Sequence, residues 1–142
     1  MVEAIVGKKG VGKTATIFEL ITKLSENEEN NIVCIENGKR FDGHVPFTVR
    51  LVDIQEFNIN GYGELLAFIS GIIAKDFDIS NIFVDSIYKV ANVEDSEGLA
   101  EFIKSLDELS KEWHVDINVT ISDDYENLPE EIKPFVVKHD QF

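Results

Sequence analysis

The chain contains little cysteine, little proline and little positive charge. Among its 142 residues are one cysteine, Cys34, and three prolines, and 13 Lys and Arg residues stand against 27 Asp and Glu residues, a formal net charge of −14. Because Cys34 lies in an apolar run, we expect a buried, unpaired thiol of a reducing compartment. The negative charge disfavours a broad electrostatic interaction with DNA or an anionic membrane. We therefore expect no direct nucleic-acid partner and no membrane partner.

Long hydrophobic stretches are also absent. The N-terminus "MVEAIVGKKG" has no basic flank followed by a long apolar core, and the most apolar later stretch, "LLAFISGIIA", is followed by Lys75 and Asp76. A membrane-spanning helix needs about 20 consecutive apolar residues, and a signal peptide needs a basic segment before its apolar one. The sequence predicts neither, and we expect a cytoplasmic protein.

The hydrophobic residues that are present are arranged in short runs. They make up 44% of the sequence and include ten Phe residues, which is enough for a packed core, and the length is typical of one domain. Runs rich in Val, Ile and Phe, which are typical of buried strands, lie at residues 2–6, 31–36, 81–87, 117–122 and 135–139. Apolar residues at helical spacing lie between them, at residues 17–24, 65–72 and 99–106.

Strands that alternate with helices predict βαβ units and hence a mostly parallel sheet covered on both sides. The predicted fold is α/β, a three-layer αβα sandwich with a mostly parallel sheet of about five strands, formed by residues 1–142 as a single domain. The stretch "FTVRLVDI" at residues 47–54 alternates enough to add a short extra strand, which we expect in an edge hairpin.

The stretch "GKKGVGKT", residues 7–14, follows the first predicted strand and precedes the first predicted helix, and it matches G-x-x-x-x-G-K-[ST]. Its glycines permit backbone angles that let successive N–H groups surround an anion, and the helix start adds its positive end. Lys13 can then bridge the β- and γ-phosphates of a nucleotide, and the Thr14 hydroxyl can bind Mg²⁺. The predicted binding residues are Gly7, Lys8, Lys9, Gly10, Val11, Gly12, Lys13, Thr14 and Ala15.

The loop resembles that of P-loop proteins, and this resemblance implies a second metal anchor at the end of a buried strand beside the loop. The run "NIFVD" ends in Asp85, which would hold Mg²⁺ through a coordinated water. The run "RLVD", which ends in Asp53, is a weaker candidate because Arg50 interrupts its apolar character.

These features resemble the P-loop NTPase superfamily, over essentially the whole chain. The resemblance implies a Walker A loop at residues 7–14, a Walker B-like segment ending at Asp85, ATP or ADP with Mg²⁺ as cofactors, and catalytic roles for Lys13 and Asp85. The loop also partly resembles the deviant Walker A of the MinD/ParA-like ATPases, in which a lysine at the position of Lys8 reaches the partner's nucleotide in a dimer. Lys9 stands where that family prefers glycine, and "DSIYKV" replaces its usual continuation after the Walker B aspartate.

The residue that would activate water is not evident. Ser86 stands where a glutamate usually follows the Walker B aspartate. Glu36, at the end of the second predicted strand, could approach the phosphates, although a loop-facing surface acid is the favoured interpretation. Thr120 or Ser122 resembles in position the polar sensor of ATPases with an inserted strand. ATP is favoured over GTP because "TISD" has Ile121 in place of the lysine of the guanine-reading motif.

The sequence therefore predicts a Mg²⁺-dependent ATP-binding protein that acts as an ATPase, and so as a hydrolase, or as a nucleotide-dependent switch. A protein partner or a homodimer is expected, because little chain remains for a separate substrate site. Two alternatives stay open. One is a small-molecule kinase with an acceptor site at Arg40 and Arg50, and the other is a module that binds nucleotide without hydrolysing it.

Overall fold

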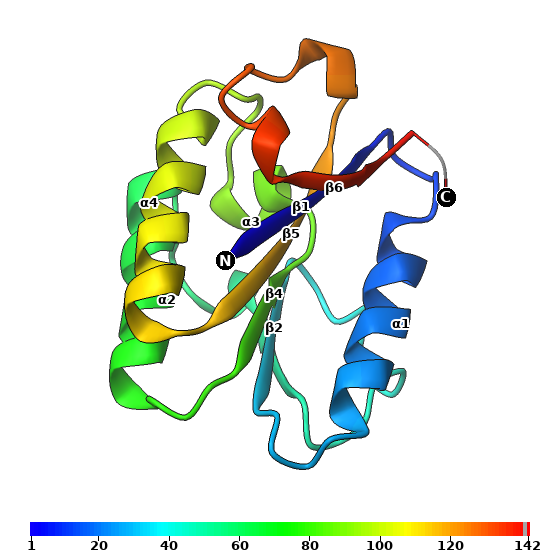
Figure 1. Ribbon diagram of the computed structural model, residues 1–142, viewed down its shortest axis with the longest axis vertical. Coiled ribbons are helices and arrows are strands. Elements are labelled where there is room, and N and C mark those ends of the chain that lie inside the picture. Colours follow the sequence, from blue (N-terminus) through cyan, green and yellow to red (C-terminus); the bar gives the residue numbers. More distant parts are fainter. Residues whose placement is uncertain (141) are drawn as a thin grey trace.

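The computed structural model describes residues 1–140 and 142, and within them six strands form one sheet (Figure 1). The strands are β1 (Val2–Gly7), β2 (Ile32–Glu36), β3 (Arg50–Asp53), β4 (Asn81–Val84), β5 (Asp116–Ser122) and β6 (Val136–His139). Their order across the sheet is β3-β2-β4-β5-β1-β6, and every pairing is parallel. All the strands therefore end at the same edge of the sheet.

Helices cover both faces of this sheet. They are α1 (Lys13–Ser25), α2 (Tyr62–Lys75), α3 (Ile87–Ala91) and α4 (Leu99–Trp113). Figure 1 shows α1 on one side of the sheet and α2 and α4 on the other. Three single 3₁₀ turns complete the described elements, at Ile54–Glu56, Tyr125–Asn127 and Lys133–Phe135. The predicted αβα sandwich is confirmed.

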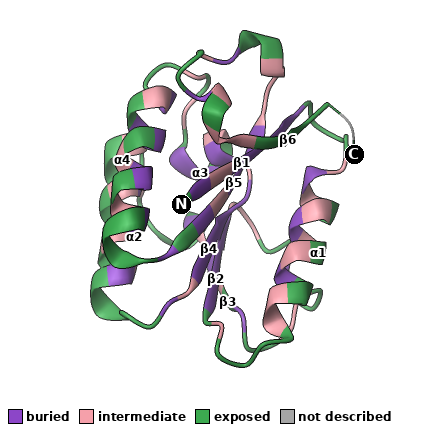
Figure 2. Ribbon diagram, viewed as in Figure 1, coloured by how far each residue is buried: buried purple, intermediate pink, exposed green. Residues whose placement is uncertain are grey.

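Two apolar cores hold the layers together. Side chains alternate along a strand, so Ala4 and Val6 pack with α2, α3 and α4 in the larger core, whereas Ile5 packs with Ile17 and Ile21 of α1 in the smaller one. Strands β2 and β4 are buried at every position, as Figure 2 shows. Their continuous apolar runs predicted this, because a parallel strand between two helical layers has no solvated face.

Cys34 lies in β2 within the smaller core, and it is buried and unpaired. Burial raises the pKa of its thiol, and the negative charges of Glu36 and Asp85 add to the shift. The expectation of a buried free thiol is confirmed.

Two predicted elements differ from the structure. The expected hairpin at residues 47–54 is wrong, because β3 runs parallel to β2 at the edge of the sheet, and residues 37–49 return the chain to the start of β3. The run predicted at residues 81–87 stops as a strand at Val84, since Ser86 has the left-handed φ of 65° and α3 begins at Ile87.

No helix within the described residues has both the length and the apolar character needed to cross a membrane.

Candidate functional site

The loop between β1 and α1 has the backbone shape that its glycines predict. Gly10 and Gly12 have φ values of +89° and +109°, in the left-handed region that side chains with a Cβ rarely adopt. Helix α1 begins directly after Gly12, so its positive end faces the loop. The loop and the helix start therefore form the kind of concavity that binds anions.

Lys13 lies across this loop. Its ammonium group is buried and donates hydrogen bonds to the carbonyl oxygens of Gly7, at 2.7 Å, and Lys8, at 2.9 Å. Burial lowers the pKa of Lys13, and the negative charge of Asp85 opposes that shift. The loop thus holds one cation at its centre, close enough to Asp85 for the two charges to interact.

Asp85 follows β4 directly and has both carboxylate oxygens engaged. The residue is 1% exposed. Its Oδ1 accepts a hydrogen bond of 2.8 Å from the hydroxyl of Thr120, and its Oδ2 forms an ion pair with the guanidinium of Arg40. The Thr120 oxygen in turn accepts a hydrogen bond from the N–H of Ser86 at 2.6 Å. These contacts compensate the buried negative charge from two sides.

The sequence predicted Asp85 at the end of the strand beside the loop. In the structure β5 lies between β4 and β1, so one strand separates Asp85 from the strand that leads into the loop. The residues of β5 that pair with β1 include Thr120 and Ser122. Thr120, one of the two expected sensor positions, is the one that contacts Asp85. Ser122 lies at the end of β5, beside Gly7 at the end of β1.

Glu36 is also buried, at 1% exposure, so its interpretation as a surface acid is wrong. Its Oε1 accepts hydrogen bonds from the backbone N–H groups of Arg40, at 2.9 Å, and Phe41, at 3.2 Å. Burial raises the pKa of the Glu36 carboxyl, and these two N–H groups oppose the shift. The carboxylate thereby fixes the turn after β2 that carries Arg40.

A cavity of about 400 Å³ opens between the loop and the strand ends, and we call it the phosphate cavity after the group that the sequence predicts for this loop. It is lined by Lys9, Gly10, Gly12, Lys13, Thr14, Arg40, Ser86, Lys89 and Ser122. Four of these residues carry positive charge and none carries a carboxylate. The charge of Arg40 is paired with that of Asp85, which leaves Lys9, Lys13 and Lys89 as the cations that favour an anion here in a chain with a net charge of −14.

The sequence-predicted residues divide between the lining and its surroundings. Lys9, Gly10, Gly12, Lys13 and Thr14 line the phosphate cavity, whereas Asp85 lies buried in contact with Arg40. Of the other predicted binding residues, Gly7 ends β1, Val11 and Ala15 are exposed, and Lys8 forms an ion pair of 3.5 Å with Asp124 while its side chain remains 72% exposed.

Sequence reasoning missed Lys89 and the contact between Arg40 and Asp85. Lys89 lies on α3, which begins just after Asp85, so the proximity of the two residues in the chain was an available signal. Arg40 and Asp85 are 45 positions apart, and no local pattern connects them.

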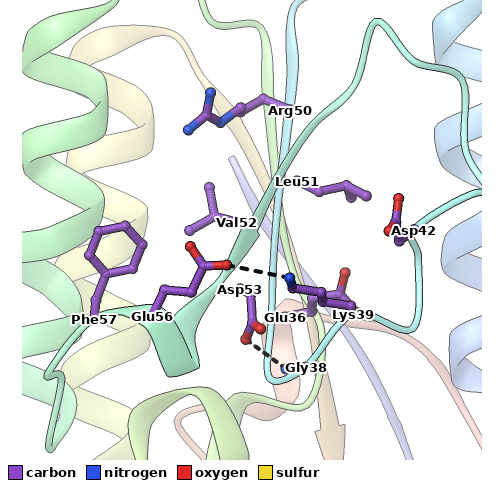
Figure 3. Close-up of a pocket in the computed structure, with 10 residues that line it drawn as sticks. All are labelled: Glu36, Gly38, Lys39, Asp42, Arg50, Leu51, Val52, Asp53, Glu56 and Phe57. Atoms are coloured by element: carbon purple, nitrogen blue, oxygen red, sulfur yellow. Dashed lines mark hydrogen bonds and ion pairs between the residues drawn. The ribbon is translucent and has the colours of Figure 1, made fainter.

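A second, smaller cavity of about 180 Å³ lies along β3 and beside the end of β2 (Figure 3). It carries charges of both signs, including an ion pair of 3.8 Å between Lys39 and Glu56. Asp53 accepts hydrogen bonds from the N–H groups of Gly38 and Gln55, so its carboxylate holds two turns. Arg50 lines this cavity and Arg40 lines the phosphate cavity, so the structure does not bring the two arginines into one acceptor site.

Comparisons with protein-family models and with curated proteins find no match for this chain.

The buried Glu36 carboxylate gives a prediction about stability. In Glu36→Ala the N–H groups of Arg40 and Phe41 lose their acceptor, and we expect a loss of about 1–3 kcal/mol in the free energy of unfolding. Urea unfolding followed by circular dichroism measures this loss. Glu29→Ala, at an exposed position, is the control, with an expected change within about 0.5 kcal/mol. Equal stability of the two variants would contradict the role given to Glu36.

Proposed function

We propose that this protein binds the polyphosphate of Mg·ATP or Mg·ADP in the phosphate cavity, as a P-loop protein does. The main support is the cavity at the glycine loop and the start of α1. Lysine and arginine side chains line this cavity and no carboxylate does, although the chain as a whole is strongly acidic. The proposal assigns Lys13 to the phosphates, and the Thr14 hydroxyl and Asp85 to the metal ion, Asp85 through a bound water.

The donor set fits a magnesium ion. Mg²⁺ is usually held in such sites by one or two protein oxygens together with phosphate oxygens and water, and Thr14 and Asp85 offer one hydroxyl and one carboxylate. Within the described residues no group of three or more His, Cys, Asp or Glu side chains is placed to hold a metal ion. With one hydroxyl and one carboxylate, the unchanged protein should therefore bind the ion weakly by itself and more tightly together with a nucleotide.

The sheet order supports the same proposal. Because β5 separates β4 from β1, the chain resembles the P-loop ATPases with an inserted strand, and the contact between Thr120 and Asp85 fits the place of their polar sensor. ATP is favoured over GTP because "TISD" has Ile121 in place of the lysine of the guanine-reading motif.

We further propose that the protein acts as a nucleotide-dependent switch or as a slow ATPase that needs a protein partner. Hydrolysis requires a group that positions water. Ser86 follows Asp85, and Glu36 is committed to two backbone N–H groups. A module that binds nucleotide without hydrolysing it is the second candidate, because no carboxylate lines the phosphate cavity. A small-molecule kinase has less support, because Arg40 and Arg50 line different cavities.

The partner could be a second copy of the chain, as the partial resemblance to the MinD/ParA-like ATPases implies. In support, the side chain of Lys8 is 72% exposed and does not line the phosphate cavity of its own chain. Its ion pair with Asp124 is a surface pair of the kind that contributes little free energy, so Lys8 can leave it at small cost.

Calorimetric titration with Mg·ADP, Mg·ATP and Mg·GTP tests the site. We expect adenine-nucleotide binding to weaken by about 10- to 100-fold in Lys13→Ala, because a buried cation at the phosphates is lost. Lys23→Ala, at an exposed position on the same helix, is the matched control and should bind as the unchanged protein does. Unaltered binding in Lys13→Ala would contradict the assignment.

The rate of ATP hydrolysis tests the proposed role. Without a residue that positions water, the isolated chain should release phosphate at a rate on the order of 10⁻³ s⁻¹ or below. Chromatographic separation of ATP and ADP over several hours measures this rate, with Lys13→Ala as the background. Turnover at about 1 s⁻¹ or faster would contradict the role of a switch. Rapid transfer of phosphate to an added acceptor would indicate a kinase.

A further inference from the structure

We propose that Arg40 controls access of the metal ion to Asp85, so that a divalent cation binds there only by displacing the guanidinium, which then moves to the phosphates. This inference rests on the proposed function in taking Asp85 as a metal anchor. Arg40, which lies outside the glycine loop, would then regulate metal binding at Asp85.

The geometry places Arg40 between the buried carboxylate and the phosphate cavity. The side chain of Asp85 is 1% exposed, whereas that of Arg40 is 46% exposed and also lines the cavity. Thr120 holds one oxygen of Asp85 and Arg40 holds the other. A metal ion or its coordinated water that approaches Asp85 from the cavity therefore competes with Arg40.

Electrostatics give this competition its direction. While Arg40 pairs with Asp85, the two charges largely cancel, and a divalent cation gains little by approaching them. Removal of the guanidinium leaves a buried carboxylate whose charge is compensated only by a hydroxyl and by the more distant Lys13. An uncompensated buried charge is costly, and a divalent cation relieves that cost.

A polyphosphate provides the displaced guanidinium with a new partner. The turn that carries Arg40 is fixed from the backbone side by Glu36, so the side chain can move while its backbone stays at the cavity. Guanidinium groups bind phosphate oxygens as well as carboxylates. The metal ion and the nucleotide should therefore strengthen each other's binding, and this coupling is reciprocal.

Titration with Mn²⁺ alone, with the free ion followed by electron paramagnetic resonance, tests the first half of the proposal. Arg40→Ala should bind one Mn²⁺ at least about tenfold more tightly than the unchanged protein. Arg50→Ala is the matched control, because it changes the net charge equally but lies at the other cavity. It should leave Mn²⁺ binding as it is. The double variant Arg40→Ala/Asp85→Asn should lose the gain.

If Arg40→Ala does not fold, Arg40→Gln replaces it in the Mn²⁺ titration, because glutamine keeps a hydrogen-bond donor beside Asp85 but removes the charge. Arg50→Gln is then the control. Equal Mn²⁺ affinity in the Arg40 and Arg50 variants would overturn the proposal. A gain that persists after Asp85→Asn would also overturn it, because the ion would then bind elsewhere.

Addition of ADP tests the second half. ADP should raise the Mn²⁺ affinity of the unchanged protein by a larger factor than that of Arg40→Ala, because in that variant no guanidinium has to be displaced. An equal or larger factor in Arg40→Ala would overturn the coupling. The experiment with Mn²⁺ alone contains no nucleotide, so its failure would refute the control of Asp85 by Arg40 independently of the proposed function. Failure of the Lys13→Ala titration would refute the function instead.

Discussion

The parallel direction of all six strands is the constraint on which the rest of the site depends. Because the strands point the same way, the chain leaves β1, β2, β4 and β5 at one edge, and Gly7, Glu36, Asp85 and Ser122 lie there without any of them being close in sequence. Open α/β sheets bind ligands at this edge. The two apolar cores fix the strands, so the positions of these polar groups follow from packing as much as from their own contacts.

The turn after β2 compensates the negative charges of two buried carboxylates at this edge, in two different ways. Glu36 accepts hydrogen bonds from the backbone of the turn that follows it, and Asp85 pairs with the Arg40 side chain of the same turn. The turn therefore joins the end of β2 to the end of β4, and it contributes a cation to the phosphate cavity. Loss of the Glu36 carboxylate would leave the buried N–H group of Phe41 without an acceptor, which is more costly than the hydrogen bond is worth. Loss of Asp85 would instead leave the half-exposed guanidinium of Arg40 to be solvated by water.

Sequence patterns predicted those features that depend on neighbouring residues. The apolar runs gave the positions of the strands, and the spacing of glycines and Lys13 gave the loop and the start of α1. The parallel pairing of β3 was not predicted, because alternating residues do not distinguish a hairpin from a crossover. Sequence patterns did not predict that Glu36 is buried and accepts hydrogen bonds from the turn after it, or that Arg40 contacts Asp85. Both features depend on how residues 37–41 fold back over the edge of the sheet.

Amide NMR spectra of the ¹⁵N-labelled protein during titration with Mg·ADP test whether phosphates bind at the glycine loop, as we propose. We expect the resonances of Gly10, Gly12 and Lys13 to shift together with that of Arg40, and resonances at the second cavity, such as those of Asp53 and Phe57, to stay in place. Shifts confined to the second cavity, or a loop whose resonances do not respond, would contradict this proposal.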